Sequence, residues 1–276
     1  MVLHRQKESL FREYLVRLHG ETSGIVHCYP NALNTIDELF AVYNPLGLNR
    51  SVWDIEDEKT LNEIFFFFKS QEHSPSEKMV AAFPGNRTSY LAQRFCSSAL
   101  HKLIGFNSEN SIIENALRNA DSSDDLGKRL ENLLKLKEKK GRDVAVETTQ
   151  RAGQYLFRHA LLKIYSGQCA VTGIRVVPVL RASHISEWAK DTENRLNPAN
   201  GICLSATFDA AFDRHLISFD DDYRMLLTPA LKEYFTNDET RETFEQYEGK
   251  RLLLPYDVRF LPGQKLLRSH RQKCGL

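Results

Sequence analysis

Residues 180–213 read LRASHISEWAKDTENRLNPANGICLSATFDAAFD and decide the fold of the C-terminal half of this 276-residue chain. Residues 174–180 form a short apolar segment with several β-branched side chains, and residues 202–204 form a second one. A polar loop rich in Asn, Asp and Pro separates the two, and a helical apolar pattern begins near Ala206. The sequence therefore predicts a strand, a loop, a second strand and a helix, in that order.

The segments on either side extend this pattern. Residues 154–165 carry a helical apolar stripe that ends at Ser166-Gly167. Residues 216–219 and 223–227 flank three consecutive aspartates, which predicts a hairpin after the helix.

Two carboxylates lie four residues apart on the helix predicted near Ala206. Asp209 and Asp213 would project from one face, where both could reach one hard divalent cation. The alternative is a solvent-facing pair whose like charges repel each other by roughly a few tenths of a kcal/mol. A shared cation explains the pair better, and oxygen ligands favour Mg²⁺ or Mn²⁺ over Zn²⁺.

A histidine and an asparagine complete the candidate site. His184 stands at the end of the first predicted strand, and an imidazole with an unperturbed pKa of about 6.5 can accept a proton near neutral pH. Asn200 precedes Gly201, and this dipeptide is typical of a turn. Taken alone, His184 could be a structural histidine and Asn200 a simple turn residue.

These motifs and their flanks resemble a prokaryotic, restriction-type subfamily of the HNH (ββα-metal) endonucleases. The lead-in YSGQCAVTG at residues 165–173 matches, and the motifs that hold His184, Asn200 and Asp209 follow in that family's order. The resemblance covers roughly residues 150–272. It implies metal-dependent hydrolysis of DNA phosphodiester bonds with Mg²⁺ or Mn²⁺, and a role in restriction or anti-phage defence.

The resemblance also implies a role for each candidate residue. His184 corresponds to the general base, and Asn200 to the residue that fastens the loop orienting this base. Asp209 takes the third motif position, usually His or Asn, as a metal ligand, and Asp213 corresponds to a second helix ligand of some members. Ser183 stands at the position of a further metal ligand and is the third candidate metal residue, but it departs from the pattern, because many HNH nucleases place an Asp or His ligand there. Either Asp213 compensates for it, or water and the scissile phosphate complete the shell of the cation.

The N-terminal half is predicted to be all helical. Apolar residues at helical spacing cover residues 7–20, 29–40, 61–68 and 90–104. The most apolar run, residues 65–68, is interpreted as a buried helix face. The predicted fold class is therefore α+β, with an all-helical N-terminal domain followed by a ββα-metal nuclease domain.

A second, weaker resemblance concerns this helical half. Its apolar positions are similar to those of the helical core-binding domain of tyrosine recombinases, which clamps DNA, at residues 11–15, 29–33, 52–55 and 61–64. No recombinase catalytic set is present in the sequence. Binding of a partner protein is the alternative role.

Composition and charge pattern predict three parts. Residues 1–106 form a helical domain that binds DNA or a partner, residues 107–147 a charged linker that contains a helix, and residues 148–276 the HNH nuclease domain. The linker is expected to have a flexible exit near Gly141.

Global composition limits the remaining function classes. The formal net charge of +1 argues against a sequence-blind DNA coat but allows a local basic groove. The cysteine count is five, without a C-x-x-C pair, which favours reduced, buried thiols over disulfides or a zinc knuckle. Neither a membrane span nor a signal peptide is visible, so we expect a cytoplasmic protein with DNA as its partner and no membrane. Homodimerisation is left open.

A binding module is the competing hypothesis. In this reading, the HNH half has lost activity and serves as a DNA-binding or protein-interaction fold, with Ser183 as the main support. Nicking of plasmid DNA that depends on His184 would exclude it.

Overall fold

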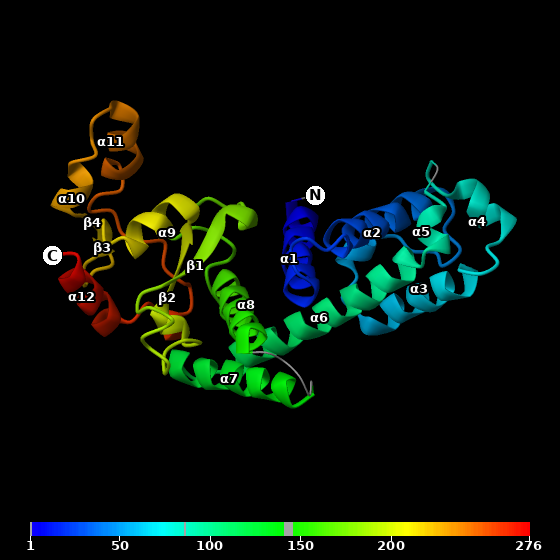
Figure 1. Cartoon of the computed structure of the whole chain (residues 1–276), viewed down its shortest axis with the longest axis horizontal. Coiled ribbons are helices and arrows are strands. Elements are labelled where there is room, and N and C mark those ends of the chain that lie inside the picture. The colour runs from blue at the N-terminus through cyan, green and yellow to red at the C-terminus, as the bar shows by residue number, and fades with distance from the viewer. Residues whose placement is uncertain (1, 86, 141–145) are drawn as a thin grey trace. The chain divides into compact units, whose positions relative to one another are not determined.

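Across the part of the chain that the structure describes, helices predominate and the strands form two short antiparallel pairs (Figure 1). The computed structural model describes residues 2–85, 87–140 and 146–276. The chain divides into two compact units, Met1–Ile112 and Ile113–Leu276. Within the described ranges, no helix is both long and apolar enough to cross a membrane.

The elements, in chain order, are α1 (Val2–His19), α2 (Ile25–Val42), η1 (Val52–Asp54), α3 (Glu58–Gln71), α4 (Glu77–Ala82), α5 (Ser89–Ala92), α6 (Phe95–Asn119), α7 (Ser123–Lys140), α8 (Val146–Ile164), η2 (Val177–Val179), β1 (Leu180–His184), η3 (Pro198–Asn200), β2 (Gly201–Ser205), α9 (Ala206–Asp213), β3 (Ile217–Phe219), β4 (Met225–Leu227), α10 (Pro229–Lys232), α11 (Asp238–Glu245), η4 (Val258–Phe260) and α12 (Gln264–Lys273).

Aromatic packing forms the core of the first unit. The ring of Phe11 on α1 meets the rings of Trp53 and Phe106 edge-on, at centroid distances of 5.5 and 5.6 Å. Trp53 is fully buried, and its Nε1 donates to the side chain of Asn34 at 2.8 Å. The prediction of helices in this half is confirmed for the described residues.

One prediction about this unit is wrong in part. Residues 65–68 do not form one buried face, because Phe68 is fully buried whereas Phe66 is 64% exposed. Successive helical residues point roughly 100° apart, so four in a row cannot share one face.

The residues behind the recombinase-like pattern lie in the core. Phe11, Leu33, Trp53 and Leu61 are all fully buried. Such spacing is what any helical core of this size needs. A DNA-binding role for the unit therefore stays a prediction.

The second unit is built around the hairpin of β1 and β2. The strands pair antiparallel from Leu180 opposite Ser205 to His184 opposite Gly201, and α9 packs on both (Figure 1). The predicted strand, loop, strand and helix are confirmed in this order. The predicted hairpin of β3 and β4 is confirmed too.

The first strand is shorter than predicted. Residues 174–179 were expected to belong to it, but β1 begins at Leu180 and the turn η2 precedes it. Pro178 lies in this turn and has no N–H to donate to a strand neighbour. The guanidinium of Arg158 on α8 instead donates to the carbonyls of Val177 and Leu180, at 3.1 and 2.7 Å.

The charged segment between the two predicted domains is largely helical. α6 continues to Asn119, and the division between the compact units falls inside it. In α7, Leu126 and Leu130 are fully buried, and the helix packs on α8 and η3. The exit expected near Gly141 lies outside the described residues, and the functional division of the chain stays a prediction.

Candidate active site

The hairpin and the following helix bring Ser183, His184 and Asp209 together. Ser183, at the end of β1, is 2% exposed, and its hydroxyl donates to the carboxylate of Asp209 on α9. The charge of Asp209 acts on the pKa values of both His184 and Asp213. Ser183 therefore orients a predicted metal ligand.

His184 is held in one orientation by three neighbours. Its ring stacks on Phe157 of α8 at 4.0 Å between centroids, and Trp188 meets it edge-on at 5.3 Å. Its Nε2 lies 3.0 Å from the carbonyl oxygen of Arg195. Because a carbonyl only accepts, a neutral ring must carry its proton on Nε2, which leaves Nδ1 able to accept another.

The electrostatics of His184 favour the neutral ring. Burial lowers its pKa from the ordinary value, while the hydrogen bond to the Arg195 carbonyl and the charge of Asp209 act in the opposite direction. The neutral imidazole is the form that a general base requires.

Gly201 makes room for this arrangement. It lies opposite His184 in the β-ladder, and a β-carbon at this position would come within 2.6 Å of the Phe157 ring. Its φ of −139° is extended, so Asn200-Gly201 is not the left-handed turn that the dipeptide suggests. The glycine is needed for the close approach of α8 to the strand.

Asn200 joins the two ends of the polar loop. The residue is fully buried, and its Oδ1 accepts from the backbone N–H of Ser186 at 2.7 Å. Its Nδ2 donates to the carbonyls of Ser186 and Asn194, at 3.1 and 3.2 Å. All three bonds are to backbone atoms of the loop, so the Asn200 side chain ties the loop together.

Asp209 and Asp213 supply oxygen donors from one helix. Partial burial, and after it the negative charge of Asp209, raise the pKa of Asp213. Two carboxylates that repel each other beside a serine hydroxyl form an oxygen-only donor set, which suits a hard divalent cation. By their chemistry, these side chains fit a hard divalent cation.

A further cluster lies at the C-terminal end of α9, where His215 has a φ of 57°. His270 of α12 is buried and contacts His215 Nδ1 through Nε2 at 3.2 Å. Through its other nitrogen, Nδ1, it contacts Ser218 Oγ at 2.9 Å and Cys274 Sγ at 3.5 Å.

This cluster fastens α12 to α9 and β3. The donor atoms of the two histidines and Cys274 lie within 4.8 Å of one another. His270 uses opposite ring nitrogens toward His215 and Cys274, so the contacts of its ring join all three residues. The sequence alone assigned no role to His215 or His270. The two lie 55 positions apart, so no local sequence pattern indicates that they are in contact.

The burial of His270 predicts a pH-dependent stability. Burial lowers its pKa to about 4. Above about pH 6.5 the ring is neutral in both the folded and the unfolded chain, so its burial does not lower the free energy of unfolding there. As the pH falls toward 4, only the unfolded chain binds the proton. We expect the free energy of unfolding to fall by about 2 to 3 kcal/mol through this residue between pH 7 and 4.5.

Urea unfolding at the two pH values measures this effect. His270→Gln has no titrating ring, so its unfolding free energy should depend less on pH by the same amount. His73→Gln, at an exposed histidine, is the matched control and should keep the pH dependence of the unchanged protein. An equal pH dependence in all three proteins would contradict the prediction.

Comparison with known proteins agrees with the geometry of the hairpin and helix. A family model described as HNH endonuclease matches residues 169–220. The matched segment contains β1, β2 and α9, and with them every residue of the candidate site. No curated protein matches the chain.

Proposed function

We propose that this HNH endonuclease segment hydrolyses DNA phosphodiester bonds with the help of one divalent cation. The observation that carries the proposal is the state of His184. Its Nε2 faces the Arg195 carbonyl at 3.0 Å, which leaves Nδ1 as the nitrogen that can accept a proton, and the negative charge of Asp209 acts on the ring. A fixed neutral base next to a cation-binding carboxylate suits the activation of water.

In the proposed reaction, His184 Nδ1 takes a proton from the attacking water. The oxygen of that water forms a bond to phosphorus, and the bond from phosphorus to the 3′ oxygen breaks. The products therefore carry 5′-phosphate ends. Asn200 keeps the loop closed over the base, and Ser183 orients the carboxylate of Asp209.

Asp209 would hold the cation, and Asp213 is the second candidate ligand. When bound, the cation offsets the negative charge that grows on the phosphate. Ser183 is committed to Asp209, so water and the scissile phosphate would supply the remaining ligands, as Mg²⁺ permits.

Dependence on a divalent cation tests this proposal. We expect the purified protein to nick or cut DNA with Mg²⁺ or Mn²⁺, to lose all activity in excess chelator, and to regain it when either ion is restored. Zn²⁺ should be unnecessary, because the donor set contains only oxygen. Full activity in excess chelator would contradict the one-metal mechanism.

A role in restriction or anti-phage defence and a cytoplasmic location are further parts of the proposal, supported only by the resemblance to restriction-type nucleases. The helical first unit would bind DNA or a partner protein. A catalytically impaired binding module remains the competing function. An assay on supercoiled plasmid separates the two, because the impaired module binds DNA without nicking it.

A further inference from the structure

Helix α7 contacts the loop that carries the carbonyl partner of His184, here called the site loop (residues 186–197). Asn197, at the end of the site loop, is 7% exposed, and its Nδ2 donates to Oδ1 of Asp124 at 2.7 Å. A β-carbon at Gly127 would lie only 3.1 Å from the Cα of Asn197. The helix backbone and the loop backbone are therefore in close contact at Gly127.

The other part of the site loop packs nearby through Trp188. A β-carbon at Gly153 of α8 would lie 3.0 Å from the indole ring and 3.5 Å from Leu134 of α7. Glycine at position 153 therefore leaves the space that the indole needs between the two helices.

Contacts inside the site loop connect these two anchors to His184. Arg195 Nε donates to the carbonyl of Trp188 at 2.7 Å, and the guanidinium lies 5.6 Å from the indole centroid. The carbonyl of Arg195 is the one that His184 Nε2 faces. A shift of the loop would therefore move the acceptor that fixes the tautomer of the base.

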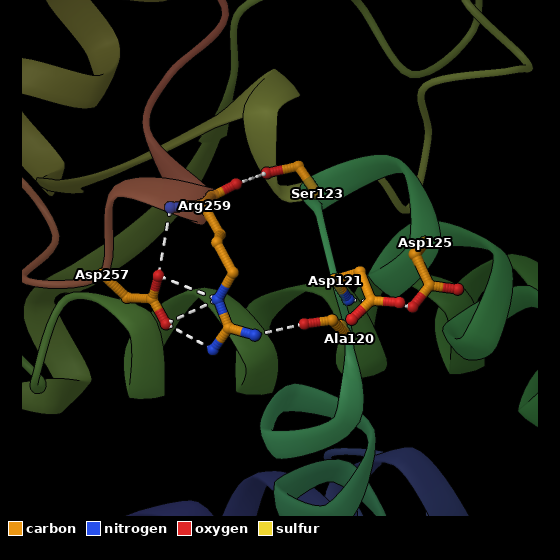
Figure 2. Close-up of polar contacts among 6 residues, drawn as sticks. All are labelled: Ala120, Asp121, Ser123, Asp125, Asp257 and Arg259. Atoms are coloured by element: carbon orange, nitrogen blue, oxygen red, sulfur yellow. Dashed lines mark hydrogen bonds and ion pairs between the residues drawn. The ribbon is translucent and has the colours of Figure 1, made fainter.

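The start of α7 is itself fixed. Figure 2 shows Arg259 between the carboxylate of Asp257 and the carbonyl of Ala120, in the short connection between α6 and α7. The Ser123 hydroxyl donates to the carbonyl of Arg259 at 2.7 Å. The segment around η4 thus holds the first turn of α7 in place.

We propose that Asp124 and Gly127 of α7 are positioning residues for the base. They hold the site loop so that the Arg195 carbonyl keeps the proton of His184 on Nε2 and leaves Nδ1 to face the water. The inference deepens the proposed nuclease function and rests on it for its effect on cleavage. Neither residue touches substrate in this role.

Three variants at the start of α7 separate positioning from charge. Asp124→Ala removes the acceptor that α7 offers to Asn197 and leaves only the bond from Asn197 Nδ2 to Asn194 within the loop. We expect cleavage to fall by about tenfold, since misplacement of a catalytic group is costly in rate. Asp124→Asn keeps an acceptor oxygen and should restore most of the activity. Asp125→Ala removes an equal charge from the same turn, where Asp125 pairs with Arg129 and not with the loop, and should cut at the normal rate.

Ring-nitrogen NMR of His184 gives a readout that a merely structural role would not move. We expect the Nε2–H tautomer in the unchanged protein, Asp124→Asn and Asp125→Ala, measured where the ring is neutral. Asp124→Ala should add the Nδ1–H tautomer. The His184 signals are identified by their loss in His184→Gln.

Gly127→Ala supplies an independent variant. Alanine favours the helix over glycine, but its β-carbon would push on Asn197. We expect cleavage to fall and the His184 ring signals to change without loss of folded protein.

The positioning role is overturned if Asp124→Ala and Gly127→Ala cut normally with an unchanged tautomer, or if activity falls only in proportion to the folded fraction. The NMR signals of His184 can be recorded whether or not the protein cuts DNA. If the folded, unchanged protein cuts no DNA, the proposed nuclease function is refuted, and the tautomer of His184 in the variants still tests the positioning role of Asp124 and Gly127.

Discussion

His184→Ala is expected to abolish DNA cleavage while the protein stays folded. General-base catalysis contributes roughly 10²- to 10⁴-fold to a reaction rate. The variant loses the imidazole that stacks on Phe157 and on which the charge of Asp209 acts. Supercoiled plasmid with Mg²⁺ should remain intact over times in which the unchanged protein converts it completely. Thermal unfolding measured on the same preparation reports whether the variant is folded.

Two further variants sharpen this result. His184→Gln keeps an N–H that can donate to the Arg195 carbonyl but has no basic nitrogen, so it should be as inactive as His184→Ala and more stable. His73→Ala, at an exposed histidine of the first unit, should cut normally, which shows that replacing a histidine does not by itself remove activity. Loss of cleavage in the His184 variants, purified in the same way, excludes a contaminating nuclease. Activity in His184→Gln above a few per cent of normal would remove His184 from the role of base.

Asp209→Asn is the second change with a large expected effect. The amide can still accept from Ser183, but it loses the charge that we propose binds the cation, so cleavage should fall by roughly 10²-fold or more. Stability should hold or rise, because the repulsion that contributes to the raised pKa of Asp213 is removed. Asp209→Ala should behave similarly in cleavage.

Ser183→Ala is the complementary control. It removes the hydrogen bond to Asp209 and keeps the carboxylate charge, so its cleavage rate should fall less than that of Asp209→Asn.

Titration with Mn²⁺ followed by calorimetry should show weakened binding in Asp209→Asn. A large fall in thermal midpoint with unchanged specific activity would instead make Asp209 a structural residue.

Local periodicity explains which parts of the fold could be predicted. The helix at Ala206 and the strand that ends at His184 follow from the spacing of apolar residues within a few positions, and both are confirmed. The strand expected at residues 174–179 failed because Pro178 interrupts the ladder, a signal that was present in the sequence.

Contacts between distant segments could not be predicted in this way. The stacking of Phe157 on His184 depends on Gly201 having no side chain, and no single segment contains all three. The cluster around His270 likewise joins α9, β3 and α12. The charged face of α7 suggested a linker, although its buried leucines, also visible in the sequence, already indicated packing.

The contact of α7 with the site loop determines how much of the chain would have to be transferred with the proposed nuclease. The segment that matches the family model begins at residue 169, after Asp124, Gly127 and Phe157. A transplant of that segment alone, or a truncation that starts near residue 148, would leave behind the helix against which the loop rests. In a gene fusion that borrows this nuclease, the junction belongs ahead of Ser123, whose hydroxyl holds the Arg259 carbonyl. The structural unit that would have to be transferred is therefore longer than the segment that matches the family model.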